Sequence, residues 1–286
     1  MIPRSADPSP FEIEVGGTPL GRFVLFADVF LAADRPDRLE AELEDGVGRA
    51  GWRAALRPGA PVRARIAGAE VFEGSLDRAA LRADPGSCVR IGVVAYAAYH
   101  YRRREAARGA YRHATDSEIA ESIAAALRLQ AVVEPTAPAL DRVVLEGDPL
   151  SHLRRRAREI GFELAVAREA LYFSREVPAE RTVAIAASRL FSADLEDLGR
   201  DRGGRGGSLE LAGDPDLRPL AAVLLRGAHR AADGTYRVVR AVHRLRPGGY
   251  RTAVQVLEEG LDYERWRRGE AGRAGDLSRA GGSAHG

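Results

Sequence analysis

The chain has 286 residues, 45% hydrophobic and 29% charged, which is typical of a folded protein with one large or two to three small domains. A formal net charge of +2 argues against a general nucleic-acid binder, and no apolar run approaches the roughly 20 residues that a membrane helix needs. All 43 basic residues are arginine, which excludes every mechanism that depends on a lysine, such as a P-loop, a kinase site or a Schiff base.

Cys88 is the only cysteine, so the chain has neither an intramolecular disulfide nor a metal site built from several cysteines. Its position at the start of a strand-like run predicts a buried, inert thiol. Residues 1–10 are rich in proline and lack the apolar core of a signal peptide. We therefore expect synthesis and folding in the cytoplasm, and we expect no cofactor.

Residues 1–104 have the pattern of a β-rich domain. Apolar residues alternate with glutamate in Phe11–Val15, and Gly16-Gly17 is typical of a hairpin turn. Several short strands at this spacing predict an antiparallel barrel or sandwich. The strands are expected over Phe11–Val15, Leu20–Val29, Leu39–Glu44, Val62–Ala67, Glu70–Leu76 and Cys88–Tyr101.

Residues 105–180 differ in composition and are expected to form an α/β insert. Thr115 and Glu118 have the spacing of a capping box, in which each side chain bonds the backbone N–H of the other at the start of a helix. The helix predicted from there ends near Leu129, and Pro135 breaks the chain soon after it.

A strand, a second helix and a hairpin are predicted in the same insert. Asp148 is placed to cap the helix, and Pro149 suits its first position, where a missing N–H costs nothing. Gly161 suits the left-handed residue that ends a helix. Alternating apolar residues then predict a hairpin from Phe162–Val166 and Leu171–Phe173.

Residues 181–264 are predicted to form a second β-rich domain, and residues 265–286, rich in Gly, Ala, Arg and Ser, a disordered tail. Glycines and arginines predict a flexible loop over Gly199–Gly207. The fold class expected for the chain is therefore α+β but mostly β, with two tube-like antiparallel β-barrel domains flanking an α/β insert. Strands of the second domain are expected over Arg181–Ile185, Leu220–His229, Thr235–Arg246 and Gly249–Glu258.

No motif of an enzyme or a metal site stands out. The histidines lack the spacing of a helical zinc site, and His229 and His243 fit ordinary residues of neighbouring strands better than metal ligands. Gly203–Gly207 resembles an anion nest but lacks a preceding strand and a following helix. We therefore expect no catalytic, cofactor-binding or metal-binding residue. Five carboxylates fit solvated strand ends better than a glycosidase pair: Asp194, Glu196, Asp197, Glu258 and Glu259.

Two arginine clusters remain as candidates for a functional surface. One is Arg102–Arg104, and the other lies on the polar face of the helix that starts at Pro149, where charge is normally solvated. Arginine also favours interfaces, because its planar guanidinium pairs with a carboxylate through two bonds. The alternative to a solvated surface is a subunit interface, with candidate residues Arg102, Arg103, Arg154, Arg155 and Arg158.

The order of these features resembles the phage late control protein D family and the N-terminal hub half of VgrG proteins. A long strand runs into a junction rich in Tyr and Arg, Tyr96–Arg104, and a helix start of the form Thr-x-Ser-Glu-Ile follows at Thr115–Ile119. Near the C-terminus, a Tyr-x-Val strand, His243 and Gly249–Thr252 are also similar to the family. The second helix and its hairpin match at Asp148, Leu153, Ala157, Gly161, Phe162, Leu164, Leu171, Tyr172 and Phe173.

The resemblance implies a non-enzymatic baseplate hub of a contractile tail or injection machine. Such hubs are homotrimers in which two similar barrels per subunit build a ring between the hexameric inner tube and the trimeric spike. The implied partners are a separate spike protein, the inner tube protein and baseplate wedge or tube-initiator proteins, without nucleic-acid binding or membrane insertion. The protein is then expected to leave the cytoplasm as part of an assembled phage tail or injection particle.

Two other functions stay open from the sequence. One is a tail-associated peptidoglycan hydrolase, supported only by the carboxylates at positions 194–197. The other is a cargo-binding or receptor-binding module of the same particle, with Trp52 and the loop at 199–207 as its contacts.

Overall fold

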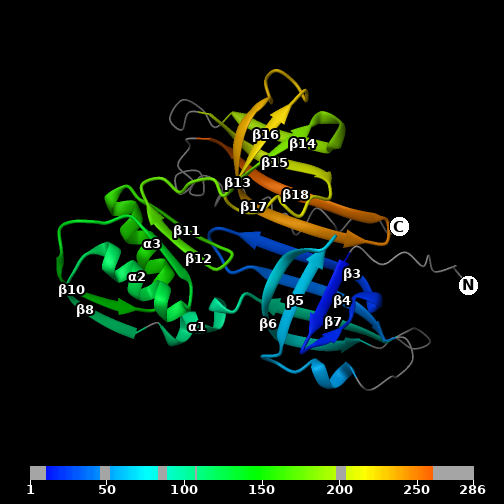
Figure 1. The fold of residues 1–286 in the computed structure, drawn as a ribbon, viewed down its shortest axis with the longest axis horizontal. Helices are drawn as coiled ribbons and strands as arrows, with labels where there is room; N and C mark the ends of the chain where they lie inside the picture. The colour runs from blue at the N-terminus through cyan, green and yellow to red at the C-terminus, as the bar shows by residue number, and fades with distance from the viewer. Residues whose placement is uncertain (1–10, 46–51, 83–88, 107, 198–203, 260–286) are drawn as a thin grey trace, which may run out of the picture.

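The structure is a computed structural model that describes residues 11–45, 52–82, 89–106, 108–197 and 204–259. It confirms an α+β fold that is mostly β: a long curled sheet carries a smaller α/β unit on one side (Figure 1). No helix in these ranges is long and apolar enough to cross a membrane. The thiol of Cys88 and the predicted tail at 265–286 lie outside the described residues.

The long sheet has 13 strands, in the order β14-β15-β18-β17-β3-β4-β7-β6-β5-β1-β2, with β16 also paired to β17 and β13 to β16. Its first strands are β1 (Phe11–Val15), β2 (Thr18–Pro19), β3 (Val24–Ala32), β4 (Arg38–Asp45), β5 (Pro61–Ile66), β6 (Ala69–Arg82) and β7 (Val89–Tyr96). Its later strands are β13 (Arg181–Ala186), β14 (Leu190–Asp197), β15 (Arg205–Ala212), β16 (Ala221–Arg226), β17 (Gly234–Arg246) and β18 (Gly249–Glu258). Short 3-10 helices span Gly21–Phe23, Trp52–Ala55 and Ala187–Arg189.

Strands from the two ends of the chain share this sheet. Alternation decides which side chains enter the core: Phe11, Ile13 and Val15 are buried, whereas the glutamates between them are exposed. β3 pairs antiparallel with β17, with Phe30 opposite Val242. One apolar core runs under both groups of strands. The two β-rich parts predicted from the sequence are thus joined edge to edge, as the blue and orange ribbons of Figure 1 show.

The α/β unit has its own core and two small sheets, β10-β8 and β11-β12-β9. Ile119 and Ile123 of its second helix pack with Leu153 of its third helix and Phe173 of the hairpin, and all four are buried. Its elements are α1 (Tyr99–Glu105), β8 (Arg108–Ala114), α2 (Asp116–Leu127), β9 (Gln130–Val133), β10 (Leu140–Glu146), α3 (Pro149–Ile160), β11 (Glu163–Ala167) and β12 (Ala170–Ser174).

The predicted helix ends are confirmed. Thr115 Oγ1 accepts the N–H of Glu118, and the Glu118 carboxylate accepts the N–H of Thr115, which completes the capping box of α2. Asp148 accepts the N–H of Ser151 at 3.0 Å and so caps α3. Gly161 ends α3 in the left-handed conformation, with a φ of 73°.

Some predicted boundaries are wrong. The strand expected over Cys88–Tyr101 ends at Tyr96, and α1 follows it. The prediction extended the strand too far because Ala97, Tyr99 and Tyr101 continue the alternating pattern of a strand. The strand expected from Leu20 starts at Val24, after a 3-10 turn. The end of the expected loop at 199–207 belongs to β15, which starts at Arg205. β2, β8, β9, β14 and β15 were not predicted.

Candidate functional site

The α/β unit meets the long sheet at the loop Ala33–Asp37, between β3 and β4. The N–H of Val166 on β11 donates to Ala33 O (2.9 Å), and Arg154 of α3 donates to Asp34 O (2.8 Å). The hydroxyl of Tyr99 on α1 donates to Arg35 O (3.1 Å). Three elements of the α/β unit therefore bond to the backbone of one short loop.

Two ion pairs reinforce this junction. Arg240 of β17 donates to the Asp34 carboxylate at 2.9 Å. Arg237 of β17 binds both oxygens of the Glu163 carboxylate on β11, each at 2.9 Å. These four side chains are only 4–21% exposed, so water screens the pairs weakly, and the bidentate pair also fixes an orientation. The junction therefore sets the position of the α/β unit on the sheet.

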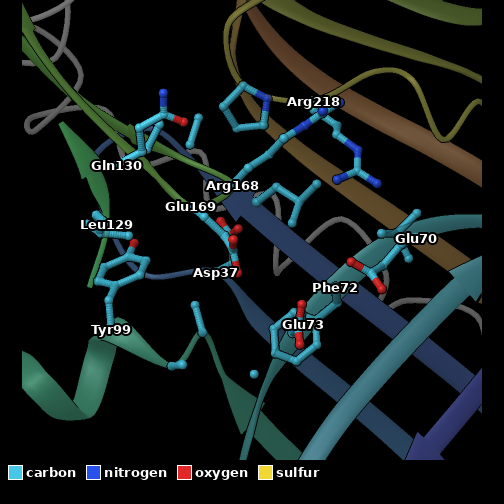
Figure 2. Close-up of a pocket in the computed structure, with 18 of the residues that line it drawn as sticks. Asp37, Glu70, Phe72, Glu73, Tyr99, Leu129, Gln130, Arg168, Glu169 and Arg218 are labelled. Carbon is cyan, nitrogen blue, oxygen red and sulfur yellow. The ribbon is translucent and has the colours of Figure 1, made fainter. Parts of the chain in front are cut away.

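A cleft of about 1010 Å³ opens beside the junction, between the α/β unit and β6 (Figure 2). Asp37 reaches it from the loop between β3 and β4, and Arg218 from the loop before β16. The turn between β11 and β12 contributes Arg168 and Glu169. The cleft is lined by both charged and apolar side chains, and the strands that supply them lie far apart in the sequence.

Asp37 has an unusual environment for a carboxyl group. Its Oδ1 accepts the N–H of Ala32 at 3.1 Å. Burial raises the pKa of Asp37 to about 7, although the Ala32 N–H and the charge of Arg218 act in the opposite direction. Near neutral pH the group is therefore divided between its charged form and its protonated form, which can donate a hydrogen bond.

Arg218 lies in the cleft and is partly buried. Its Nε donates to a backbone carbonyl of its own loop at 3.1 Å. Burial, and then the nearby charge of Arg168, lower the pKa of Arg218. Other acids of the cleft are paired elsewhere, Glu180 with Arg168 and Asp216 with Arg181. Within the described ranges no carboxylate forms an ion pair with Arg218, so the cleft contains a partly desolvated cation.

The five arginines predicted as interface residues have different surroundings. Arg103 pairs through two bonds with Asp148, the cap of α3, with 2.7 Å between Nε and Oδ1. Arg102 donates to a backbone carbonyl at the end of α2 (3.1 Å), and Arg154 is buried in the junction. Arg155 and Arg158 are exposed on α3. Arg155 pairs with Glu159 one turn along the helix, and Arg158 donates to the backbone carbonyl of Arg154. An interface role stays a prediction for all five arginines.

The two histidines considered as metal ligands have other contacts. His243 is buried, and its Nδ1 lies 2.7 Å from the Tyr250 hydroxyl. Burial lowers the pKa of His243 to about 3, so the ring is neutral at physiological pH. His229 Nδ1 accepts the N–H of Ala231. The described part of the chain contains no group of three or more His, Cys, Asp or Glu side chains able to hold a metal ion.

The glycine-rich stretch and the carboxylates are placed in ordinary strands. Arg205 of β15 binds Glu258 of β18 at 2.8 Å, which ties neighbouring strands together. Asp194 and Glu196 lie on β14 and are exposed. Gly204 precedes β15 and Glu259 follows β18, and the other described residues of the two groups lie on strands. Residues 198–203 lie outside the described ranges.

The long sheet also contains two stretches that are exposed on both faces. β14 ends the strand order and pairs with β15; six of its eight residues are exposed and none is buried. Residues 77–82 of β6 are all exposed, and Arg78–Arg82 pair with β7. Phe191 and Leu81, one in each stretch, are both 57% exposed. Strands with two exposed faces have no alternation of apolar and polar residues, so β14 and the end of β6 could not be predicted from the sequence.

The architecture thus belongs to a defined class: a long curled antiparallel sheet, built from both ends of the chain, with an α/β unit bonded to the loop between β3 and β4. No family profile matches the sequence, and no curated protein matches it.

Solved structures share this fold. The 43 kDa tail protein of prophage MuSo2 from Shewanella oneidensis has a TM-score of 0.66 at 12% identity, over 88% of this chain and 97% of that one. The tail protein from Neisseria meningitidis MC58 has a TM-score of 0.65 at 12% identity, with the same coverage. The E. coli c3393 protein, a component of the type VI secretion system, has a TM-score of 0.66 at 12% identity, over 83% of this chain and 74% of that one. The likeness extends over both β-rich parts and the α/β unit.

Proposed function

We propose that this chain is a structural component of a phage tail or a related injection machine, and that it forms a trimeric hub between a hexameric inner tube and a trimeric spike. The observation that carries the proposal is the likeness to two tail proteins over 88% of this chain and 97% of theirs. The proposed partners are a separate spike protein, the inner tube protein and baseplate wedge or tube-initiator proteins.

The sheet supports a role in matching two symmetries. Each chain has two β-rich parts that lie side by side and are joined through β3 and β17. Three copies would therefore present six such parts toward a six-fold tube, while the trimer itself keeps the three-fold symmetry of a spike. The bonded junction at Ala33–Asp37 would hold the α/β unit in the same position in every copy.

The two exposed stretches support a head-to-tail contact between copies. Asp194, Glu196 and Asp197 make β14 acidic, whereas Arg78 and Arg82 make the end of β6 basic. Because the two surfaces differ, the contact is heterologous, and such a contact closes into a ring when its rotation allows. An exposed strand edge presents unpaired N–H and C=O groups with which a strand of another chain can pair.

A charge-reversal experiment tests the ring. Arg78→Glu with Arg82→Glu should shift the protein from trimer to monomer in sedimentation analysis, because like charges then face each other. Adding Asp194→Lys and Glu196→Lys to the same chain should restore the trimer. The control is Arg142→Glu with Arg226→Glu, which reverses two exposed charges on β10 and β16. A wild-type chain that stays monomeric at high concentration, alone and with the tube and spike proteins, would overturn the proposal.

No specific observation favours the other two functions. Asp194 and Glu196 lie on an exposed strand, where a carboxyl group lacks the apolar surroundings that give a glycosidase its acid. For a cargo-binding or receptor-binding module, the side chain of Trp52 and residues 198–203 lie outside what the structure describes.

A further inference from the structure

The two-stranded sheet of β8 and β10 presents one face to solvent. Its other face packs against the core of the α/β unit through Tyr111, Val143 and Leu145. On the solvent face Ala110 lies opposite Val144, and both are exposed, Val144 at 46%. Figure 1 shows this sheet on the side of the α/β unit away from the long sheet. The face is therefore separate from the proposed contact between β14 and β6.

Two arginines lie directly opposite each other on the same face. Arg112 of β8 is in register with Arg142 of β10, and both are exposed. Neither side chain forms a hydrogen bond or an ion pair with another described residue. Like charges at directly opposite positions of an antiparallel pair are unfavourable, because the Cβ atoms are only about 5 Å apart. A carboxylate between the two guanidinium groups would remove this repulsion and accept hydrogen bonds from both.

The adjacent acidic residue does not neutralise these arginines. Asp141 precedes Arg142 in β10, and alternation along the strand directs its side chain to the other side. Asp141 is also exposed, so water screens its charge. We call the set of Ala110, Arg112, Arg142 and Val144 the arginine face. It places two positive charges next to an apolar patch that lies two residues along each strand, about 7 Å away.

We infer that the arginine face is a docking surface for an extended acidic segment of a partner protein, which places a carboxylate between Arg112 and Arg142 and an apolar side chain on Val144. A segment with an acidic and an apolar residue two positions apart matches this spacing, since alternate side chains of an extended chain share one side. The exposed apolar patch favours a protein over a nucleic acid, which needs a longer row of positive charges along its phosphates. The inference goes beyond the proposed hub and does not depend on the ring.

Fluorescence anisotropy with labelled peptides tests the surface on the full chain. The probe is Ser-Glu-Ser-Val-Ser-Glu-Ser, blocked at both ends, and a matched probe has glutamine at both glutamate positions. The glutamate probe should bind at least about threefold more tightly, a modest factor because ion pairs in contact with water are weak. Arg112→Gln with Arg142→Gln should abolish this preference. Arg57→Gln with Arg226→Gln, which removes two exposed arginines outside the α/β unit, should retain it.

Two further variants separate the surface from stability and from the ring. The double variant at 112 and 142 should melt at or above the wild-type temperature by circular dichroism, because it removes two charges that repel each other. Val144→Ser should weaken both probes, because it removes the apolar contact. Arg142→Glu with Arg226→Glu, the control for the ring, should keep the trimer and lose the preference for glutamate.

Four results would overturn the inference. The first is equal binding of the two probes to the wild type, which includes failure of both to bind. The second is a preference for glutamate that survives in the double variant at 112 and 142. The third is tighter binding of a short oligothymidylate than of the glutamate probe, which would make the face a nucleic-acid surface. The fourth is full binding by Val144→Ser, which would reduce the face to an anion site.

Discussion

Single residues show how the environment of a side chain decides its chemistry. Asp148 and Asp37 are both aspartates near the α/β unit, yet their pKa values are shifted in opposite directions. Burial acts to raise the pKa of Asp148, but bonds from Arg103 and Ser151 outweigh it, so the pKa lies below its usual value. Among the residues that the structure describes, Asp37 has one backbone donor and no ion pair, so burial dominates. The opposite pKa shifts of Asp37 and Asp148 therefore follow from the number of hydrogen bonds that each carboxyl group accepts.

The raised pKa of Asp37 predicts a pH dependence of stability. In the unfolded chain the carboxyl group of Asp37 loses its proton above a pKa of about 3.9, whereas in the native state it keeps the proton up to about pH 7. The free energy of unfolding therefore falls as the pH rises from about 4 to 7. Asp37→Asn keeps an acceptor for Ala32 and lacks the titration. The quantity to follow is the free energy of unfolding of the wild type minus that of the variant. This difference should fall by about 1 kcal/mol or more as the pH rises from about 4 to 7. A shift of one pKa unit corresponds to about 1.4 kcal/mol, and the expected value is smaller than the full shift would give because Asp37 is partly exposed.

Urea unfolding followed by circular dichroism at several pH values measures this difference. Asp141→Asn, which makes the same change at an exposed position of β10, is the matched control for the loss of one carboxylate. A difference between wild type and Asp37→Asn that stays constant from pH 4 to pH 8 would contradict the prediction. Protonation of His243 affects both proteins equally and cancels in the comparison.

At the scale of elements, the structure distinguishes strands with one buried face from strands with none. β1 and β5 could be predicted because their core residues alternate with charged ones, and α2 and α3 because their caps are local. β14 could not, because no face of it is buried. The cleft could not be predicted either: Asp37, Arg168 and Arg218 come together only through pairing between distant strands. Alternating strands and helix caps could be predicted because they depend on neighbouring residues. The cleft could not, because it depends on contacts between distant parts of the chain.

The hairpin of β14 and β15 depends on a close backbone approach at Gly207. A Cβ added there would overlap the carbonyl oxygen of Asp194 on the neighbouring strand. Gly207→Ala should therefore open β14 locally at a cost of about 1–3 kcal/mol, while the core stays folded. Hydrogen exchange should show faster exchange confined to residues 190–197.

Gly248→Ala is the control for this hairpin, since a Cβ at Gly248 meets no atom within 4 Å. Because β14 is the acidic half of the proposed contact, Gly207→Ala should also weaken the trimer. Unchanged exchange in β14 would show that the hairpin accommodates the added Cβ without opening and would contradict the prediction.

At the scale of the whole molecule, the position of the α/β unit depends on few contacts. Glu163→Gln leaves Arg237 partly buried without its counter-charge, so the free energy of unfolding should fall by about 1–3 kcal/mol, and the α/β unit should become mobile on the sheet. Small-angle scattering should then show a larger radius of gyration.

Glu210→Gln provides the comparison for this junction, because it breaks a pair whose arginine, Arg251, is 56% exposed. The loss there should be at most about 1 kcal/mol. If the two variants lose equal stability and neither changes the scattering, the junction does not fix the α/β unit.

The pairing of β3 with β17 also dictates an order of events during synthesis. Phe30 and Val242, opposite each other in the sheet, are separated by 212 residues (242 − 30), so β3 must wait for nearly the whole chain to leave the ribosome. The α/β unit contains only pairings within residues 108–174 and can form earlier. Until β17 is synthesised, the edge of β3 that will pair with it is unpaired and can pair with another chain, which leads to aggregation. Contacts between residues so far apart in the sequence also form slowly. The last step of folding would therefore be the one that joins the two β-rich parts.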